Sequence, residues 1–316
     1  MGRRVLIVIA IAALLTYAAV GWAVYRGREW VRLAAAEISD ESKPWQEVER
    51  PATSFDVAAG RRLVIENRRG NVQVLPGSGK VTVEAIVSVR ADTAAQARRL
   101  AESVSISGTP EGADAFRITV SKARDDLRAR TDLVVHAPAD LPVEIMASLG
   151  DVHVSDRNAA VTVTNRAGNI EVRRGRGDVT IGNSAGNITI SSVRGRVKTT
   201  VSAGEIEMHD LYGPVEARCS AGNVFLTAVE SDDINASASM GNVDIRLTRP
   251  FSGRLAARTS AGNVTIAIPR GSRCRVETDV SLGQTNASLP DSITAGNPPG
   301  LITASSSMGN VEITEE

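Results

Sequence analysis

One four-residue segment, Ser-Ala-Gly-Asn or a close variant of it, recurs through the second half of the chain. Copies or variants stand at 184–187, 202–205, 220–223, 239–242, 260–263 and 307–310. Each copy is followed by two apolar residues separated by one other residue, as in Ile188-Thr189-Ile190. This period-two alternation indicates a short strand with one buried face. Because so short a strand has no stability alone, the copies must stack on one another.

The spacing of the repeat sets the geometry of the stack. From Gly150 to Gly222 a glycine, or Ala159 in its place, recurs every nine residues, and one additional residue precedes Asp232. The Ser-Ala-Gly-Asn form occupies every second marker, so a full turn has about 18 residues, two strands and two unlike corners. We therefore predict an all-β fold, a β-solenoid whose turns stack at ~4.8 Å around one core of Val and Ile.

Each residue of the repeated segment has an expected role. The glycine is expected to hold a positive φ, which a residue without a Cβ tolerates. The asparagine amide can bond turn backbone or the asparagines of neighbouring turns. The residue before the glycine is expected to point inward, and the serine before that to form a second polar ladder. The predicted structural corners are Gly168, Gly186, Gly204, Gly222, Gly241, Gly262, Asn187, Asn223, Asn242 and Asn263.

The part of the chain before the regular repeats is also rich in strand patterns. Residues 53–147 alternate or run apolar between turn signals, and we assign them to the N-terminal β-rich part of the solenoid. Residues 92–104 are the exception, because Ala94, Ala97 and Leu100 recur at helical spacing. The regular repeats then occupy 148–316.

The N-terminal segment predicts a membrane anchor. Val5 to Tyr25 carries no charge, and at ~1.5 Å per residue it is long enough to span the bilayer interior. We predict an uncleaved transmembrane signal-anchor at 5–25, with residues 1–4 as a cytoplasmic tail and 26–52 as a stalk. The body would then lie outside the cytoplasm. A cleaved secretory signal is the alternative.

Strand-rich segments, one helix and Gly-Asn-[Val/Ile]-x-[Val/Ile] repeats behind a membrane anchor resemble the bacterial Toastrack family, also labelled as adhesins or as a domain of unknown function. The resemblance covers about residues 53–316 and rests on the texture of the repeats. It implies a β-rich repeat fold and a place in the cell envelope, in adhesion or in stress responses. It implies no catalytic residues.

Composition excludes several classes of function. Lys+Arg and Asp+Glu both number 36, so the chain has no net charge that would favour nucleic acid as a partner. The three histidines are scattered and the two cysteines form no C-x-x-C pair, so we expect neither a metal site nor a cofactor.

One outward-facing patch combines different chemistries. Glu207 and Asp244 are two turns apart, or ~10 Å, near the carboxylate spacing of inverting glycosidases. Phe225 is expected between them, with His209 at the strand end. The patch is either a solvated surface or the site of a glycan-active enzyme. The arginine pairs at 61–62, 68–69 and 98–99 present a similar choice between anionic polymer or lipid and water.

Three functions are compatible with these features. The first is a non-enzymatic, membrane-anchored envelope protein that presents a rigid solenoid for adhesion, scaffolding or binding of an envelope protein or a cell-wall glycan. The second is an accessory sensor or regulator of an envelope-stress signalling system. The third is a polysaccharide-active β-helix enzyme.

The spacing also predicts two properties of the free protein. Cys219 and Cys274 lie about three turns, or ~14 Å, apart, beyond the ~7 Å that a disulfide bridges, so both thiols are expected to be free. The last strand, in 310–316, is predicted to be the open edge of the stack. Glu312, Glu315 and Glu316 would repel a second copy there, which predicts a monomeric body.

Overall fold

The computed structural model describes residues 43–122, 129–289 and 300–316. No helix within these ranges is long and apolar enough to cross a membrane. The predicted tail (1–4) and anchor (5–25) lie outside the described residues, so the structure gives the anchor no support. The predicted stalk (26–52) is described only from residue 43 onward, and its end already belongs to a strand.

Within the described residues, twenty-five strands form two sheets. The first sheet contains, in spatial order, β1 (Trp45–Phe55), β4 (Val81–Arg90), β7 (Ala129–Ala137), β3 (Val72–Pro76), β9 (Val152–Arg157), β11 (Ile170–Gly175), β13 (Ile188–Arg194), β15 (Ile206–Tyr212), β17 (Val224–Glu230), β19 (Val243–Leu247), β21 (Val264–Ile268), β25 (Val311–Glu315) and β23 (Thr285–Ser288). The second contains β22 (Cys274–Leu282), β24 (Gly300–Met308), β20 (Arg254–Ala261), β18 (Asp233–Met240), β16 (Val215–Ala221), β14 (Val197–Ala203), β12 (Val179–Ala185), β10 (Val161–Ala167), β8 (Val143–Leu149), β2 (Arg62–Arg69), β6 (Ala115–Lys122) and β5 (Val104–Glu111).

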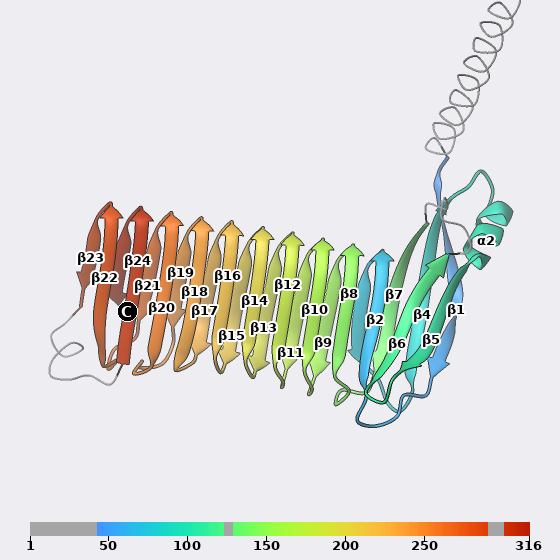
Figure 1. Ribbon diagram of the computed structural model, residues 1–316, viewed down its shortest axis with the longest axis horizontal. Helices are drawn as coiled ribbons and strands as arrows, with labels where there is room; N and C mark the ends of the chain where they lie inside the picture. The colour runs from blue at the N-terminus through green and yellow to red at the C-terminus, as the bar shows by residue number, and fades with distance from the viewer. Residues whose placement is uncertain (1–42, 123–128, 290–299) are drawn as a thin grey trace, which may run out of the picture. The chain divides into compact units, whose positions relative to one another are not determined.

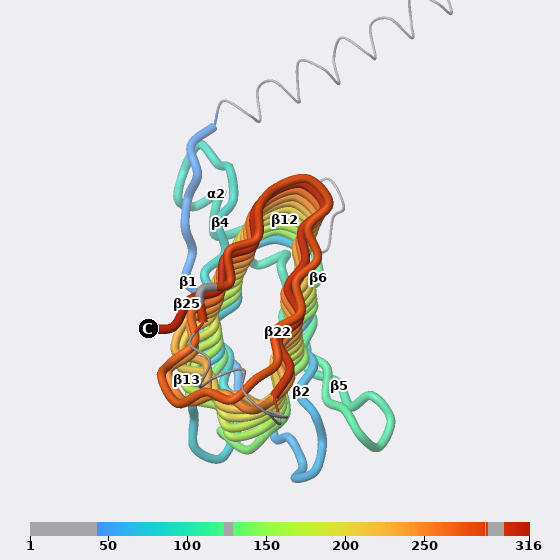
Figure 2. The backbone as a smooth tube through the Cα atoms, turned by 90° about the vertical axis from the view of Figure 1, so that its left-hand side faces the viewer, coloured from blue at the N-terminus to red at the C-terminus, as the bar shows by residue number. Residues whose placement is uncertain are grey.

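The two sheets face each other across a narrow apolar core, and successive turns superimpose along the axis (Figures 1 and 2). Parallel pairing places Val161, Val179, Val197 and Val215 in one row, each 18 residues after the last. All four side chains are buried, and each contributes about 1.5–3 kcal/mol of hydrophobic stabilisation. The solenoid and its 18-residue turn are confirmed.

The order of the turns departs from the order of the sequence at both ends. β24 and β25 lie between β20/β21 and β22/β23, so the last strands of the chain are paired on both sides. In the same way β2 and β3 lie between β6/β7 and β8/β9. The prediction that residues 310–316 form the open edge is wrong. The spacing between glycines becomes irregular after Gly262. The order of residues along the chain therefore cannot show that the last turn lies between two earlier turns.

The corner that contains the repeated segment, here called the first corner, has the predicted glycine conformation. Gly186, Gly222 and Gly262 have φ values of 117°, 135° and 146°, which L-residues rarely adopt. A second requirement was not foreseen. A Cβ on any of these glycines would overlap the carbonyl oxygen of the corner glycine in the adjacent turn. Glycine is therefore needed for its φ and for the close stacking of the corners.

The asparagines form a hydrogen-bond ladder along the first corner. The backbone N–H of Asn187 donates to Oδ1 of Asn169 at 3.0 Å, and that of Asn242 donates to Oδ1 of Asn223 at 2.9 Å. The ladder passes from Asn263 to Asn310 at 2.8 Å, and so follows the spatial order of the turns rather than the sequence. The predicted bonding between asparagines of neighbouring turns is therefore confirmed. Each bond joins a backbone N–H to a side-chain oxygen rather than one side-chain amide to another.

Two details of the first corner were predicted wrongly. The residue before the glycine does not point inward, since Met240 and Leu282 are 62% and 69% exposed and Ala221 is half-buried. The serines that precede it are exposed as well. The buried polar position lies one residue earlier, where Asn165, Asn183, Cys219, Thr259 and Ser306 each donate a hydrogen bond to a corner glycine carbonyl. The turn begins one residue earlier than the alternation suggested.

Residues 43–48 and 88–102 form a separate compact unit, in which α2 (Ala94–Glu102) is the one helix among the described residues. The Gln96 N–H donates to Thr93 Oγ1 and the Gln96 side-chain oxygen accepts from the Asp92 N–H, a reciprocal pair that satisfies donors at the start of the helix. The helix buries Ala97 and Ala101. It falls within the predicted segment 92–104.

Both cysteines are free and buried, as predicted. Cys219 lies in β16 and Cys274 in β22, which are separated by β18, β20 and β24, so the thiols are four turns apart rather than three. Burial raises the pKa of both thiols, and the Cys219 thiol also donates to the Gly204 carbonyl at 3.2 Å.

We expect neither thiol to react with iodoacetamide in the folded protein at pH 8. Because the pKa of each thiol is raised, the unreactive protonated form persists at pH values above the ordinary thiol pKa of ~8.5. The folded state therefore gains stability below that value and loses it as the pH rises through the raised pKa. Mass spectrometry after labelling should show no adduct in the folded chain and two in guanidinium. Rapid labelling of folded Cys219 would contradict its burial.

Candidate binding surface at the second corner

In five consecutive turns, from β9 to β17, the second corner is shaped by a residue in the left-handed region. Asp156, Arg174, Ser192, Asp210 and Ala228 have φ between 53° and 56° although none is glycine. They recur every 18 residues, and the neighbouring turns do not pair through them. Five such residues in one column are a feature of the turn rather than an accident of one strand.

The left-handed residue shifts the alternation of side chains by one. In β13 the buried residues are Ile188, Ile190, Ser191 and Val193, and Arg194 is exposed. A shift of one residue moves every later side chain to the opposite face. It turns one residue per turn outward at the second corner, and we call these residues the corner row. The corner row includes Arg176, Arg194, Tyr212 and Glu230.

The N-terminal end of the corner row borders a hollow of about 670 Å³, here called the basic hollow. Its lining includes Asp156, Asn158, Arg174, Arg176 and Arg194. Arg174 donates to both oxygens of Asp156 at 2.6 and 2.7 Å. This bidentate bond lowers the pKa of Asp156, so the carboxylate stays ionised below its ordinary range. The Arg194 guanidinium lies over the Tyr212 ring, 4.7 Å from its centroid.

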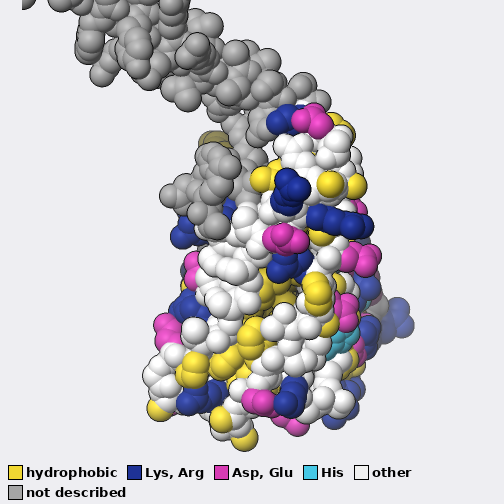
Figure 3. Space-filling view, turned by 90° about the vertical axis from the view of Figure 1, so that its right-hand side faces the viewer, with side chains coloured by type: hydrophobic (Ala, Val, Ile, Leu, Met, Phe, Trp, Pro, Cys, Tyr) yellow, Lys and Arg dark blue, Asp and Glu magenta, His cyan; other side chains and the backbone are white. Residues whose placement is uncertain are grey.

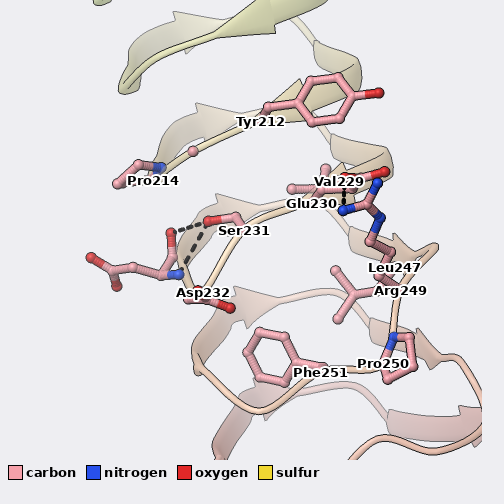
Figure 4. A pocket seen from close by; sticks show the side chains of 12 residues that line it. Tyr212, Pro214, Val229, Glu230, Ser231, Asp232, Leu247, Arg249, Pro250 and Phe251 are labelled. Carbon is pink, nitrogen blue, oxygen red and sulfur yellow. Dashed lines mark hydrogen bonds and ion pairs between the residues drawn. The ribbon is translucent and has the colours of Figure 1, made fainter.

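The next turns border a second hollow of about 480 Å³, here called the acidic hollow. Its lining includes Tyr212, Glu230, Asp232, Asp233 and Arg249 (Figure 4). Arg249 pairs with Glu230 at 2.9 Å. The hollow forms where the nine-residue spacing is lengthened, because the additional residues widen the corner.

The two hollows have opposite charge. The basic hollow is lined by three arginines and one aspartate, a formal charge of 3 − 1 = +2. The acidic hollow is lined by Glu230, Asp232, Asp233 and Arg249, a formal charge of 1 − 3 = −2. Tyr212 lies between them in the corner row. The chain has no net charge, yet positive and negative side chains are separated between the two hollows.

The structure places the predicted patch on the outer face of the first sheet. Glu207, Phe225 and Asp244 are aligned in one row across β15, β17 and β19, with His209 beside them in β15. Asp244 pairs with Arg246 at 3.4 Å, and His209 lies 3.5 Å from Asp210. Phe225 separates the two carboxylates, so they flank an exposed ring rather than share a cleft.

A smaller hollow of about 330 Å³ lies beside Arg68 and Arg69. Lys122 also lines it, and burial together with the charges of Arg69 and Arg68 lowers the pKa of Lys122. Over the face that Figure 3 shows, basic and acidic side chains are interspersed. Of the predicted arginine pairs, Arg68 and Arg69 therefore border a local hollow.

Sequence reasoning missed the second corner, although a signal was present. After the pair Ile188 and Ile190 the next apolar residue is Val193, three positions on rather than two. The same step recurs from Met208 to Leu211. This repeated change of phase marks the left-handed residue and the outward residue that follows.

The sequence model of Toastrack DUF4097 matches residues 61–314. The chain belongs to the Toastrack DUF4097 family. This confirms the resemblance that the repeats indicated. No curated protein matches the chain.

Several solved structures resemble this Toastrack chain at low identity. A putative adhesin from Bacteroides fragilis NCTC 9343 is 11% identical over 85% of this chain and 97% of its own, with a TM-score of 0.37. A putative cell adhesion protein from Clostridium sporogenes ATCC 15579 is 9% identical over 86% of this chain and 100% of its own, with a TM-score of 0.27. A putative lipid binding protein from Parabacteroides distasonis ATCC 8503 is 11% identical over 87% and 98%, with a TM-score of 0.34. Likeness at this level transfers no ligand or site to this chain.

Proposed function

We propose that this Toastrack protein is a membrane-anchored, non-enzymatic component of the cell envelope that binds an envelope polymer along its second corner. The carrying observation is the corner row, which presents arginine, tyrosine and glutamate side chains one turn apart beside two hollows. Tyr212 stands on backbone that is paired with the turns on both sides, with Arg194 on one side and Glu230 on the other. This pairing fixes the spacing of these row residues before a polymer binds.

Binding is favoured over catalysis by the surroundings of the carboxylates. A glycosidase needs two carboxyl groups on either side of one scissile bond, one of them with a raised pKa. Here Phe225 stands between Glu207 and Asp244, and Asp244 already pairs with Arg246. We therefore propose that the patch is solvated surface.

The test uses the full chain solubilised in detergent and mixed with isolated cell-envelope polysaccharide. We expect co-sedimentation that is lost in the double variant Tyr212→Ala/Arg249→Ala and kept in Glu207→Gln/Asp244→Asn. Equal binding by all three proteins would remove the second corner as the binding surface. Release of reducing sugar by the wild type, absent from Glu207→Gln/Asp244→Asn, would show that the enzyme hypothesis is correct.

The proposed anchoring has its own test. In spheroplasts, added protease should digest the body of the protein. In a separate fractionation, the undigested chain should stay with the membrane fraction after a carbonate wash. A body that is protected in spheroplasts would contradict the extracytoplasmic placement.

We also propose that the body is monomeric, for a reason different from the predicted one. The second sheet ends in β22 on one side and β5 on the other, and the exposed residues of β22 include Arg275, Glu277 and Asp279. Charged side chains on an edge strand discourage pairing with a further strand. Light scattering of detergent-solubilised chain at neutral pH should give one protomer per micelle, and filaments would contradict this.

A further inference from the structure

We propose that the basic hollow binds the anionic groups of a polyanionic polysaccharide, with Arg176 and Arg194 as the side chains that contact them. This inference rests on the proposed function, because it assigns a ligand class to one end of the second corner. The two arginines and Tyr212 belong to consecutive turns between β11 and β15, and the lining of the hollow extends from them to Pro76 and Ala139.

The charge of the hollow is not neutralised from within. The one carboxylate in the lining, Asp156, is held by Arg174 through two hydrogen bonds. Neither Arg176 nor Arg194 forms an ion pair with any residue in 43–122, 129–289 or 300–316. Two guanidinium groups thus face the hollow with donors available. Guanidinium is suited to carboxylate, sulfate and phosphate groups because its donors form a planar fork.

The backbone of one arginine and the side chain of the other are positioned before any ligand arrives. The Arg176 backbone N–H donates to the Arg157 carbonyl at 2.7 Å. The Arg194 guanidinium is held over the Tyr212 ring, at the rim of the hollow. Binding then requires little ordering of the Arg194 side chain, and ordering is the usual cost of using a surface arginine.

The spacing favours a polysaccharide over an acidic peptide. The two arginines occupy adjacent turns, which stack at ~4.8 Å. In an extended peptide the side chains on one face are ~6.8 Å apart, twice the rise per residue, so acidic side chains would fall out of step with the arginines. One pyranose ring spans close to one turn, and a chain of uronic acids offers one carboxylate per ring.

The far end of the site is set by the next hollow. Glu230, Asp232 and Asp233 follow Tyr212 along the corner, and their charge repels a polyanion. A bound polyanionic segment is therefore confined to the turns that precede Tyr212. The half-exposed ring gives the last sugar an apolar surface at that boundary.

The test measures binding of the detergent-solubilised full chain to oligouronates by calorimetry. We expect the affinity to fall at least about tenfold in Arg176→Ala/Arg194→Ala, since hydrogen bonds to charged groups are lost. The affinity of the wild type should also fall as salt rises. Arg176→Lys/Arg194→Lys should retain part of the affinity, because it keeps the charges but not the planar forks. Thermal melts show whether each variant is folded.

Matched variants and probes decide between the sources of anion. Arg68→Ala/Arg69→Ala removes two arginines from the other basic hollow and should leave oligouronate affinity unchanged. Loss of affinity in this variant, equal binding of neutral dextran, or tighter binding of polyglutamate, inorganic phosphate or phosphatidylglycerol vesicles would overturn the inference. If the wild type binds envelope polysaccharide through Tyr212 and Arg249 but binds no oligouronate, the inference fails and the proposed function stands. If the second corner binds no envelope polymer, both fail.

Discussion

Gly222→Ala is expected to lower the free energy of unfolding by roughly 2–6 kcal/mol. About 1–3 kcal/mol arises from a φ of 135° that alanine does not tolerate, and about 1–3 from steric overlap. The overlap is with the carbonyl oxygen of Gly204 in the adjacent turn, so relief requires two corners to move apart. Chemical denaturation measures the loss, and hydrogen exchange should show it concentrated in the turns around β14 and β16.

Gly182→Ala is the matched control. Gly182 lies in β12 of the same sheet, where an added Cβ meets nothing within 4 Å. We expect a change within about 0.5 kcal/mol there. Equal stability of the two alanine variants would show that the corner glycines are not required by the stacking.

Arg157→Ala is expected to cost about 3–5 kcal/mol, although no ligand or ion pair is involved. Arg157 is buried, and its guanidinium donates to the carbonyls of Ala137, Pro138 and Leu141 at 2.9, 2.5 and 2.6 Å. Its removal leaves these carbonyls without donors and opens a cavity. Burial lowers the pKa of the arginine and the charge of Asp140 raises it, but the group stays protonated at neutral pH.

Two variants serve as controls for Arg157→Ala. Arg157→Lys keeps the charge and some of the donors, so it should recover part of the stability. Arg166→Ala removes an exposed arginine nearby in the sequence and should change stability by less than about 0.5 kcal/mol. Unfolding in urea measures all three. If Arg157→Ala were as stable as Arg166→Ala, the segment between β7 and β8 would not depend on the buried guanidinium.

The sequence predicts the part of the site that depends on the alternation of side chains along a strand. The outer face of a strand is readable from alternation, so Glu207, Phe225 and Asp244 were expected in one row and lie in one row. The corner row depends on a left-handed residue in each of five consecutive turns. Ser192, Asp210 and Ala228 have no shared side chain that announces this conformation, so only the shift in apolar spacing reveals it.

The sequence by itself determined the periodic part of this protein. A period of two within strands, glycine at the corners and 18 residues per turn dictate stacked parallel strands, because only stacking buries every apolar row and satisfies every backbone group. Gly222 with positive φ and the hydrogen bonds from Asn242 to Asn223 follow from those local requirements.

The tertiary structure alone decided what depends on contacts between distant segments. Burial of Arg157 needs carbonyls from the β7–β8 connection, whereas Val193 and Leu211 occupy the equivalent position in later turns. The return of β24 and β25 to lie inside β22 and β23 depends on which of two similar strands pairs with β20 and β21. Both candidates carry the same local pattern, so local propensity is equal and only the sum of packing and ladder hydrogen bonds distinguishes them.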